Sequence, residues 1–185
     1  QKPYTRVVAH TTKWLPFVSG SQNKCGAMIR VIAPVFLSEI VNKLYNLIEN
    51  MKLSKIFKKN KNIIIGAIHL PPLLGYKEFP GFDIALKNAI DDIKALEDGG
   101  VDGIIFENNY DIPHKIVVDS SVISSMTFLG EKIRKATLLP LAISVLWNDY
   151  QSALSIAKIL GLQFVRIPVF VDKVKTDYGI VQGEP

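Results

Sequence analysis

Polar side chains with catalytic potential stand at the ends of four short apolar runs in this 185-residue sequence. An imidazole and a carboxylate can exchange protons with a substrate, and a guanidinium binds a phosphate or carboxylate through its planar fork. Amides and further carboxylates can hold hydroxyl groups or cations. The residues are His69 after the first run, Glu107, Asn108 and Asp111 after the second, Asn148 and Asp149 after the third, and Arg166 and Asp172 in and after the fourth.

We predict that His69 and Glu107 are catalytic and act as an acid/base pair, with Arg166 binding the substrate anion. His69 is followed by two prolines and Gly75, which indicate an ordered loop. Glu107 ends an otherwise apolar run. Each residue also has a structural alternative: a hydrogen-bonded histidine, a carboxylate held by backbone amides, and an ion pair of Arg166 with Glu107.

Four further residues are predicted to bind the substrate, namely Asn108, Asn148, Asp111 and Asp172. Asn148 and Asp149 together can hold a hydroxyl of a sugar or a nucleobase, although Asp149 is more simply explained as the N-cap of the next helix. Asp111 and Asp172 can join Glu107 around Mg²⁺, because oxygen ligands suit that ion. Scattered acids are usually solvated loop residues, so no metal site is predicted.

The elements that must position these residues are alternating strands and helices. Near-continuous apolar runs predict strands buried on both faces, and the helical spacing between them predicts βαβ units with a parallel sheet. The predicted strands are Ile63–His69, Val101–Glu107, Leu139–Trp147 and Gln163–Phe170. The predicted helices run from Asp83 as N-cap to Gly99 and Gly100, within Val122–Ala136, and from Asp149 as N-cap to Gly161.

The carboxyl ends of parallel strands converge at one edge of the sheet, which is where such folds bind ligands. The amino ends of the same four runs carry few polar groups. Side-chain parity adds a test: if His69 faces the mouth of the sheet, Ala67 and Ile65 share its side and Ile68 meets the helices.

The predicted fold class is α/β, a partial (β/α)8 TIM barrel of about the first four βα units. Residues 63–185 provide about half of the roughly 200–250 residues that a closed barrel uses. The same periodicity also fits an open doubly wound sheet.

The formal charge of +5 is unevenly distributed. Residues 1–62 hold 11 Lys and Arg against two acids, whereas residues 63–185 hold 11 against 15. The folded part is therefore mildly acidic, and no nucleic-acid partner is predicted.

The sequence excludes several function classes. A single cysteine, Cys25, offers neither an internal disulfide nor a zinc site, which favours a cytoplasmic protein. The apolar stretch Val31–Leu37 is far shorter than the ~20 residues of a spanning helix. Glycine-rich nucleotide loops, serine-hydrolase elbows and zinc-protease motifs do not occur, so no cofactor is assigned.

Two segments differ in composition: a basic N-terminal extension, residues 1–50, and a predicted domain, residues 51–185. The extension has three interpretations: upstream sequence translated in frame before a start at Met51, a basic targeting segment, or a helical appendage built on Phe36–Ile48. We favour the first, because Met51 begins a polar lead into the first strand.

Four motifs in order give the domain a resemblance to a known family. They are Gly66-Ala-Ile-His-Leu-Pro-Pro-Leu, Gly103-Ile-Ile-Phe-Glu-Asn with Asp111, Leu146-Trp-Asn-Asp, and Arg166-Ile-Pro-Val-Phe-Val-Asp followed by Thr176-Asp-Tyr-Gly. The chain resembles the BtpA/SgcQ family from about Asn62 to Pro185, the amino-terminal half of that family's domain. Residues 1–50 match nothing in it.

The resemblance implies a TIM barrel related to ribulose-phosphate-binding barrels. It implies a protein that binds or converts a small phosphorylated metabolite, a sugar phosphate or a nucleoside-like compound, without fixing a reaction. The alternative it implies is a non-catalytic assembly factor for membrane complexes such as photosystem I, with peripheral membrane association. A homo-oligomer is compatible with either function.

Barrels of this kind hold phosphate with loops after strands seven and eight, beyond the residues present here. We therefore expect the 185-residue chain alone to be inactive. We also expect the unpaired edges of its first and fourth strands to promote association.

Overall fold

The computed structural model describes residues 15–16 and 53–185. A helical turn at residues 53–57 precedes alternating strands and helices. In chain order these are β2 (Ile65–His69), α2 (Phe82–Asp98), β3 (Gly103–Glu107), α3 (Ser120–Ala136), β4 (Leu141–Ser144), α4 (Tyr150–Leu160) and β5 (Phe164–Val165). A hairpin of β6 (Lys173–Thr176) and β7 (Gly179–Gln182) ends the chain, and β1 (Leu15–Pro16) lies before the described domain.

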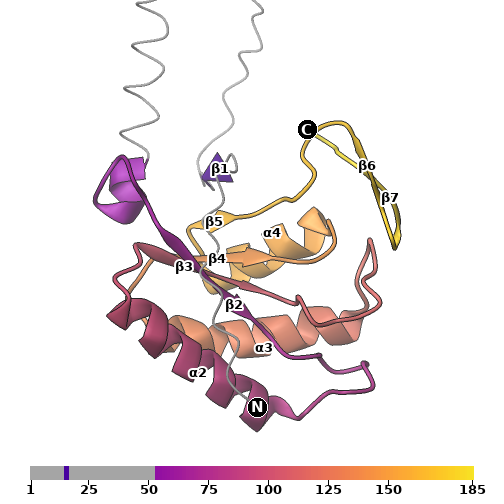
Figure 1. Cartoon of the computed structure of the whole chain (residues 1–185), viewed down its shortest axis with the longest axis horizontal. Helices are drawn as coiled ribbons and strands as arrows, with labels where there is room; N and C mark the ends of the chain where they lie inside the picture. The colour runs from indigo at the N-terminus through magenta and orange to yellow at the C-terminus, as the bar shows by residue number, and fades with distance from the viewer. Residues whose placement is uncertain (1–14, 17–52) are drawn as a thin grey trace, which may run out of the picture.

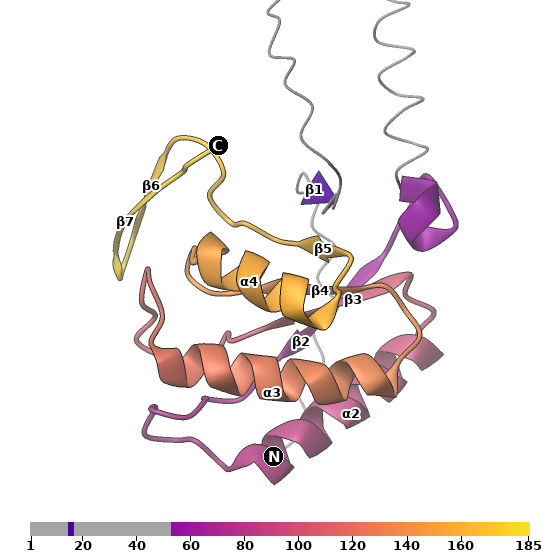
Figure 2. The same cartoon turned by 180° about the vertical axis from the view of Figure 1, so that it is seen from behind.

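The four central strands form a parallel sheet in the order β5-β4-β3-β2, with β1 antiparallel beside β5. Each new strand is therefore added next to the one before it. All three connections turn the same way, and they place α2, α3 and α4 on one face of the sheet (Figures 1 and 2). A doubly wound sheet reverses its strand order and carries helices on both faces, and the described strands show no such reversal.

The core divides between the two faces of the sheet. On the helix-covered face, Ile68, Phe106, Ile143 and Val165 pack against the buried stripes of the three helices. The other side, here called the far face, carries a smaller apolar cluster that includes the partly buried Phe57. Its members from the sheet are Ile65, Ala67, Ile105, Ala142 and Phe164. Alternate residues thus point to opposite faces, as the parity of His69, Ala67 and Ile68 predicts.

Helix α4 begins and ends where the sequence predicts. The Asp149 carboxylate caps it by accepting the Ser152 backbone N–H, and Gly161 ends it in the left-handed region at φ 65°. The prediction for α2 is wrong by two residues, because Gly81 is the N-cap and Asp83 lies in the first turn. An acid in the first turn still favours the helix through its dipole.

All four predicted strands are too long: β2 and β3 each begin two residues later than predicted, and the other two differ more. β4 ends at Ser144 rather than Trp147, and β5 covers only Phe164–Val165 rather than Gln163–Phe170. The Asn148 side chain supplies the reason. Its amide oxygen accepts the Val169 backbone N–H and its amide nitrogen donates to the Val169 carbonyl, in place of a strand ladder.

The edge of the fourth strand is also less exposed than predicted, because Leu15 pairs with Val165 and Pro16 with Phe164. The remaining interpretations of residues 1–50, including a helix over Phe36–Ile48, lie outside the described residues.

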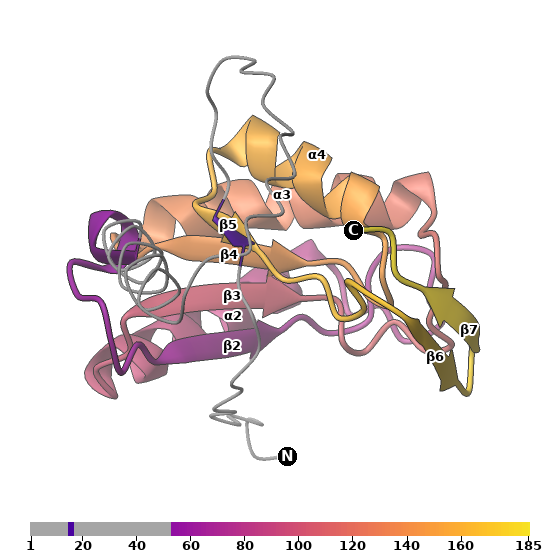
Figure 3. The same ribbon diagram turned by 90° about the horizontal axis from the view of Figure 1, so that it is seen from above.

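The β6-β7 hairpin has no counterpart in the predicted elements. It lies at the end of the sheet toward which the strand arrows point (Figure 3). Its turn packs the Tyr178 ring edge-on to His114, with centroids 5.1 Å apart, in the long loop after β3. The loops after β3 and β5 therefore meet at the carboxyl end of the sheet.

We predict that Gly130→Ala destabilises the fold, although alanine is the better helix former by about 1 kcal/mol. Gly130 lies in the middle of α3, where an added Cβ would stand 2.6 Å from Leu160 Cδ1 and 2.8 Å from Phe106 Cζ. The overlap should lower the free energy of unfolding by about 1–3 kcal/mol in a denaturant titration. Ser124→Ala, at an exposed position of the same helix, is the control and should stay near wild type. A stabilised Gly130→Ala variant would contradict the close approach of α3 to β3.

Candidate functional site

Strand pairing aligns polar residues at the carboxyl end of the far face. His69 is the register partner of Glu107, and Glu107 is the partner of Ser144. The β4-β5 ladder pairs Ile143 with Val165, and the Arg166 backbone N–H donates to the Ile143 carbonyl, so Arg166 follows next to Ser144. These four residues, here called the strand-end row, share the parity of Ala67, Ile105, Ala142 and Phe164 in the apolar layer beneath.

Glu107 is the centre of the strand-end row. Its side chain is only 6% exposed, and its Oε1 accepts a hydrogen bond from Arg166 Nη1 at 2.9 Å. Its second oxygen, Oε2, lies 3.9 Å from His69 Nε2, beyond hydrogen-bond distance. The ion pair that was the structural alternative for Arg166 is thus present. It leaves the other guanidinium donors of Arg166 without a protein partner in the described part of the chain.

His69 stands at the outer end of the row. Its side chain is about one-fifth exposed, and the Tyr110 ring packs edge-on to it with centroids 6.3 Å apart. The imidazole therefore faces both Glu107 and solvent, as a proton-transferring group requires.

Ser144 is the member of the row that sequence reasoning missed. It is completely buried, and its hydroxyl has no hydrogen-bond partner among residues 53–185. The signal in the sequence is weak: one serine in Leu-Ala-Ile-Ser-Val-Leu-Trp, two residues after Ala142 and so on the same face.

Asn108 and Asp111 join three loops at the back of the site. Asn108 accepts the Leu146 backbone N–H at 2.7 Å and donates to the Leu146 carbonyl, and it also donates to Asp111. Asp111 accepts the Leu73 backbone N–H at 2.8 Å. Both side chains are fully buried, so these bonds fix the loops after β2, β3 and β4 relative to one another.

Burial raises the pKa of the Asp111 carboxyl, and the hydrogen bonds from Leu73 and Asn108 offset part of that rise. The substrate-binding roles predicted for Asn108 and Asp111 stay predictions, because the bonds to backbone already account for much of their polar surface.

Asn148 and Asp149 are likewise engaged with the chain itself. Asn148 uses both ends of its amide on Val169. Asp149 caps α4 and also accepts the Val118 backbone N–H. The N-cap interpretation of Asp149 is thus present, and a substrate contact by Asn148 stays a prediction.

The predicted grouping of Asp172 with Glu107 is not seen: no hydrogen bond or bridging side chain among residues 53–185 joins the two. Asp172 is exposed, adopts φ 66°, and accepts the Gly183 backbone N–H at its carbonyl, so it shapes the base of the hairpin. Within the described ranges, no three His, Cys, Asp or Glu side chains are grouped so as to hold a metal ion.

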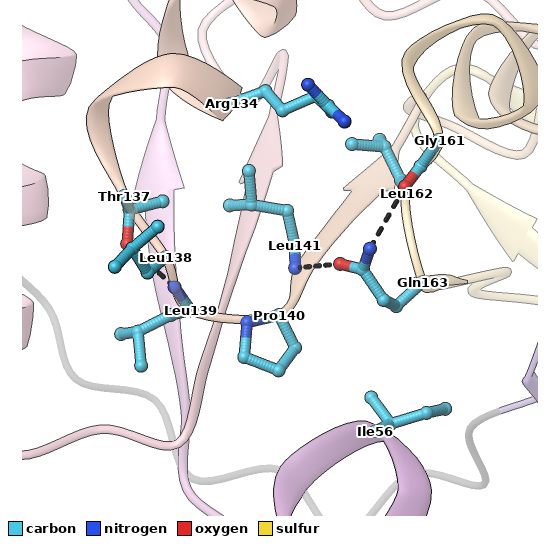
Figure 4. A pocket seen from close by; sticks show the side chains of 10 residues that line it. All are labelled: Ile56, Arg134, Thr137, Leu138, Leu139, Pro140, Leu141, Gly161, Leu162 and Gln163. Carbon is cyan, nitrogen blue, oxygen red and sulfur yellow. Dashed lines mark hydrogen bonds between the residues drawn. The ribbon is translucent and has the colours of Figure 1, made fainter.

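A cavity of about 420 Å³ opens at the opposite, amino end of β4 and β5 (Figure 4). Two of its three polar side chains are occupied, and the third, Arg134, lies at its exposed rim. Gln163 bonds the Leu141 backbone N–H and the Gly161 carbonyl, and Thr137 bonds Glu97 and the Leu139 backbone N–H. The cavity thus offers one guanidinium without an acid/base partner, whereas the strand-end row combines a carboxylate, an imidazole, a guanidinium and a hydroxyl that is unbonded within residues 53–185. We therefore place the site at the strand-end row.

Comparison with known proteins gives consistent matches. A family model described as BtpA family matches residues 60–185. The photosystem I biogenesis protein BtpA of Synechocystis sp. is 39% identical over 124 residues, which are 66% of this chain and 43% of that protein. An uncharacterized protein of Methanocaldococcus jannaschii is 38% identical over 130 residues, 70% of this chain and 49% of that protein. The protein named SgcQ, from the sgc region of Escherichia coli, is 28% identical over 120 residues, 63% of this chain and 44% of that protein.

The chain thus spans less than half the length of these curated relatives. No solved structure gives a significant match. None of the helices in the described part has the length and apolar character needed to cross a membrane.

We predict that Arg166→Gln costs stability because it leaves the buried Glu107 carboxylate without its ion-pair partner. The expected loss is about 1–3 kcal/mol in the free energy of unfolding. The double variant Glu107→Gln with Arg166→Gln should recover part of it, because a neutral amide is cheaper to bury. Lys87→Gln, which breaks an exposed ion pair with Asp91 on α2, is the control and should change little. Additive effects of the two substitutions would argue against a coupled pair.

We also predict that Asp111 makes stability fall with rising pH. Because its folded pKa is raised, its contribution is fully present below the unfolded value of about 4 and is lost as pH rises through the folded value. Asp111→Asn should lack this component. Its denaturant midpoint should therefore rise relative to that of wild type as the pH increases from 4 to 7. Carboxyl-carbon NMR should give Asp111 a pKa above its ordinary value. A titration at or below that value would refute the prediction.

Proposed function

This chain belongs to the BtpA family, and on that premise we propose that it forms the first half of a (β/α)8 barrel that binds and converts a small phosphorylated metabolite at its strand-end row. The observation that carries the proposal is the alignment of His69, Glu107, Ser144 and Arg166 on adjacent strands. A sugar phosphate or a nucleoside-like phosphate is the proposed substrate class.

The barrel is supported by the winding of the sheet. Four parallel strands in consecutive order with all helices on one face are the arrangement that each half of such a barrel has. The relatives are more than twice as long as the matched segment, which leaves room for as many further βα units. In a closed barrel the far face would be the inside, and the strand-end row would lie at the carboxyl mouth where barrel enzymes act.

His69 and Glu107 are the proposed acid/base pair. Their facing atoms are 3.9 Å apart, so a substrate hydroxyl that bridges them from the open side can lie about 2.8 Å from each. One of the two can then remove a proton while the other returns one at a neighbouring atom. Arg166 keeps one nitrogen on Glu107 and has other donors for an anionic group of the substrate.

A second candidate function is a non-catalytic assembly factor for membrane complexes. It is favoured by the name of the Synechocystis relative, a photosystem I biogenesis protein, at 39% identity. In that case the barrel is a scaffold, and its outer surface associates peripherally with a membrane complex. The two candidates differ in whether the strand-end row binds a small molecule.

We predict that a phosphorylated metabolite raises the melting temperature of the protein, because a ligand that binds only the folded state stabilises it by mass action. A panel of sugar phosphates and nucleotides, tested by thermal shift, should contain a stabilising compound. The shift should be lost in His69→Ala and Glu107→Gln variants whose far-ultraviolet circular dichroism matches wild type.

Glu131→Gln is the matched control for Glu107→Gln, because Glu131 is a carboxylate on α3 whose partners are nearby lysines rather than the row. It should keep the ligand shift. If no compound stabilises the chain while it still binds membrane complexes, the scaffold is the better explanation.

A further inference from the structure

Two buried side-chain polar atoms have no hydrogen-bond partner within residues 53–185, namely His114 Nδ1 and Ser144 Oγ. His114 packs against Tyr178 of the hairpin and belongs to a contact between loops. Ser144 belongs to no such contact. It lies in the strand-end row, between Glu107 on β3 and Arg166 on β5.

We infer that Ser144 and Arg166 together bind an oxyanion of the substrate, a phosphate or carboxylate group, through the serine hydroxyl and the outer guanidinium nitrogens. This inference rests on the proposed function and deepens it by adding a ligand-binding residue that no earlier prediction contained. It also fixes which end of the substrate lies over which strands.

The presence of a serine at position 144, rather than an apolar residue, is the first indication of a ligand. A buried hydroxyl without a partner costs about 1–3 kcal/mol relative to one that is bonded. Ala142, two residues earlier on the same strand, points to this face between Ile105 and Phe164, so a small apolar side chain suits β4 here. A serine is therefore unfavourable for packing alone, and a bonded ligand would offset its cost.

The hydrogen-bond donors of Ser144 and Arg166 indicate that the group they bind is negatively charged. Glu107 already accepts from Arg166 and faces His69, so the β2-β3 side of the row carries the acid/base pair. The β4-β5 side presents a hydroxyl and the unused guanidinium donors, with no carboxylate of its own. Hydrogen bonds from such donors to an oxyanion are charge-assisted and bidentate through the guanidinium. The oxyanion bound by this pair accordingly lies over β4 and β5, apart from the phosphate loops that such barrels carry after strands seven and eight, and the reacting atom lies over β2 and β3.

The exposure of the two side chains indicates the order in which an anion meets them. The Arg166 side chain is one-quarter exposed, whereas Ser144 is fully buried. An incoming anion meets the guanidinium first. It reaches the buried hydroxyl after a small shift of the guanidinium that keeps Nη1 on Glu107 and opens the space over Ser144.

The test uses inorganic phosphate as the probe, with the melting temperature of the 185-residue chain measured against phosphate concentration at constant ionic strength. Ser144→Ala should melt at or above the wild-type temperature without phosphate, because it removes an unbonded buried hydroxyl. Its apparent phosphate affinity should fall about 10- to 100-fold, the value of one hydrogen bond to a charged group. A structural role predicts the reverse: lower stability and unchanged affinity.

Ser125→Ala is the matched control. Ser125 is also a buried serine, but its hydroxyl donates to the Ser121 carbonyl within α3, away from the row. It should keep the phosphate affinity of wild type.

Two results would overturn the inference: wild-type phosphate affinity in Ser144→Ala, or no stabilisation of wild type by phosphate over chloride. The proposed function fails separately, if His69→Ala and Glu107→Gln leave metabolite binding intact. Loss of affinity in Ser144→Ala alone supports the oxyanion site whatever the reaction is.

Discussion

The in-register parallel pairing of β2, β3, β4 and β5 is the constraint on which the site depends. Alternate residues of a strand face opposite sides, so the pairing sets both the height and the face of every side chain. It aligns His69, Glu107, Ser144 and Arg166 above an apolar layer. A slip of one residue in β4 would turn Ser144 toward the helices and bring Ile143 into the row. The hydrophobic pattern forbids that slip, because it would also expose the residues that pack against α3 and α4.

Packing beneath the row and hydrogen bonds behind it hold the polar groups in place. The Phe57 ring packs edge-on against the Phe164 ring, with centroids 5.3 Å apart, and so covers part of the far face below the ion pair. The amides of Asn108 and Asn148 bond the backbone of loops that follow other strands. Side chains fixed in this way lose little entropy when a ligand binds, so the site is preorganised rather than assembled on binding.

The sequence predicted the alternation of elements, the parity of the first strand and the convergence of polar strand ends, because these follow from local apolar patterns. It did not predict where β4 and β5 stop. Beyond those ends the Asn108 amide bonds the Leu146 backbone and the Asn148 amide bonds that of Val169, contacts across 38 and 21 residues that no local pattern records. Ser144 was missed for a related reason, since one serine in an apolar strand is indistinguishable from a tolerated core residue until the register places it beside Glu107. The N-cap of α2 is Gly81 rather than Asp83, which shows that sequence patterns locate helix ends only to within a few residues.

The strand-end row also bears on the choice between a metabolite enzyme and a scaffold. An assembly factor contacts its partners through its outer surface, so apolar residues on the far face would serve it as well. Here the far face carries a buried carboxylate, its guanidinium partner and a hydroxyl that no group among residues 53–185 bonds. The carboxylate and the hydroxyl are costly to bury, and replacing such polar groups by apolar ones is often neutral or stabilising. A ligand that bonds all three groups would account for their presence at the carboxyl end of the sheet. Metabolite binding therefore explains the strand-end row better than a scaffold role does.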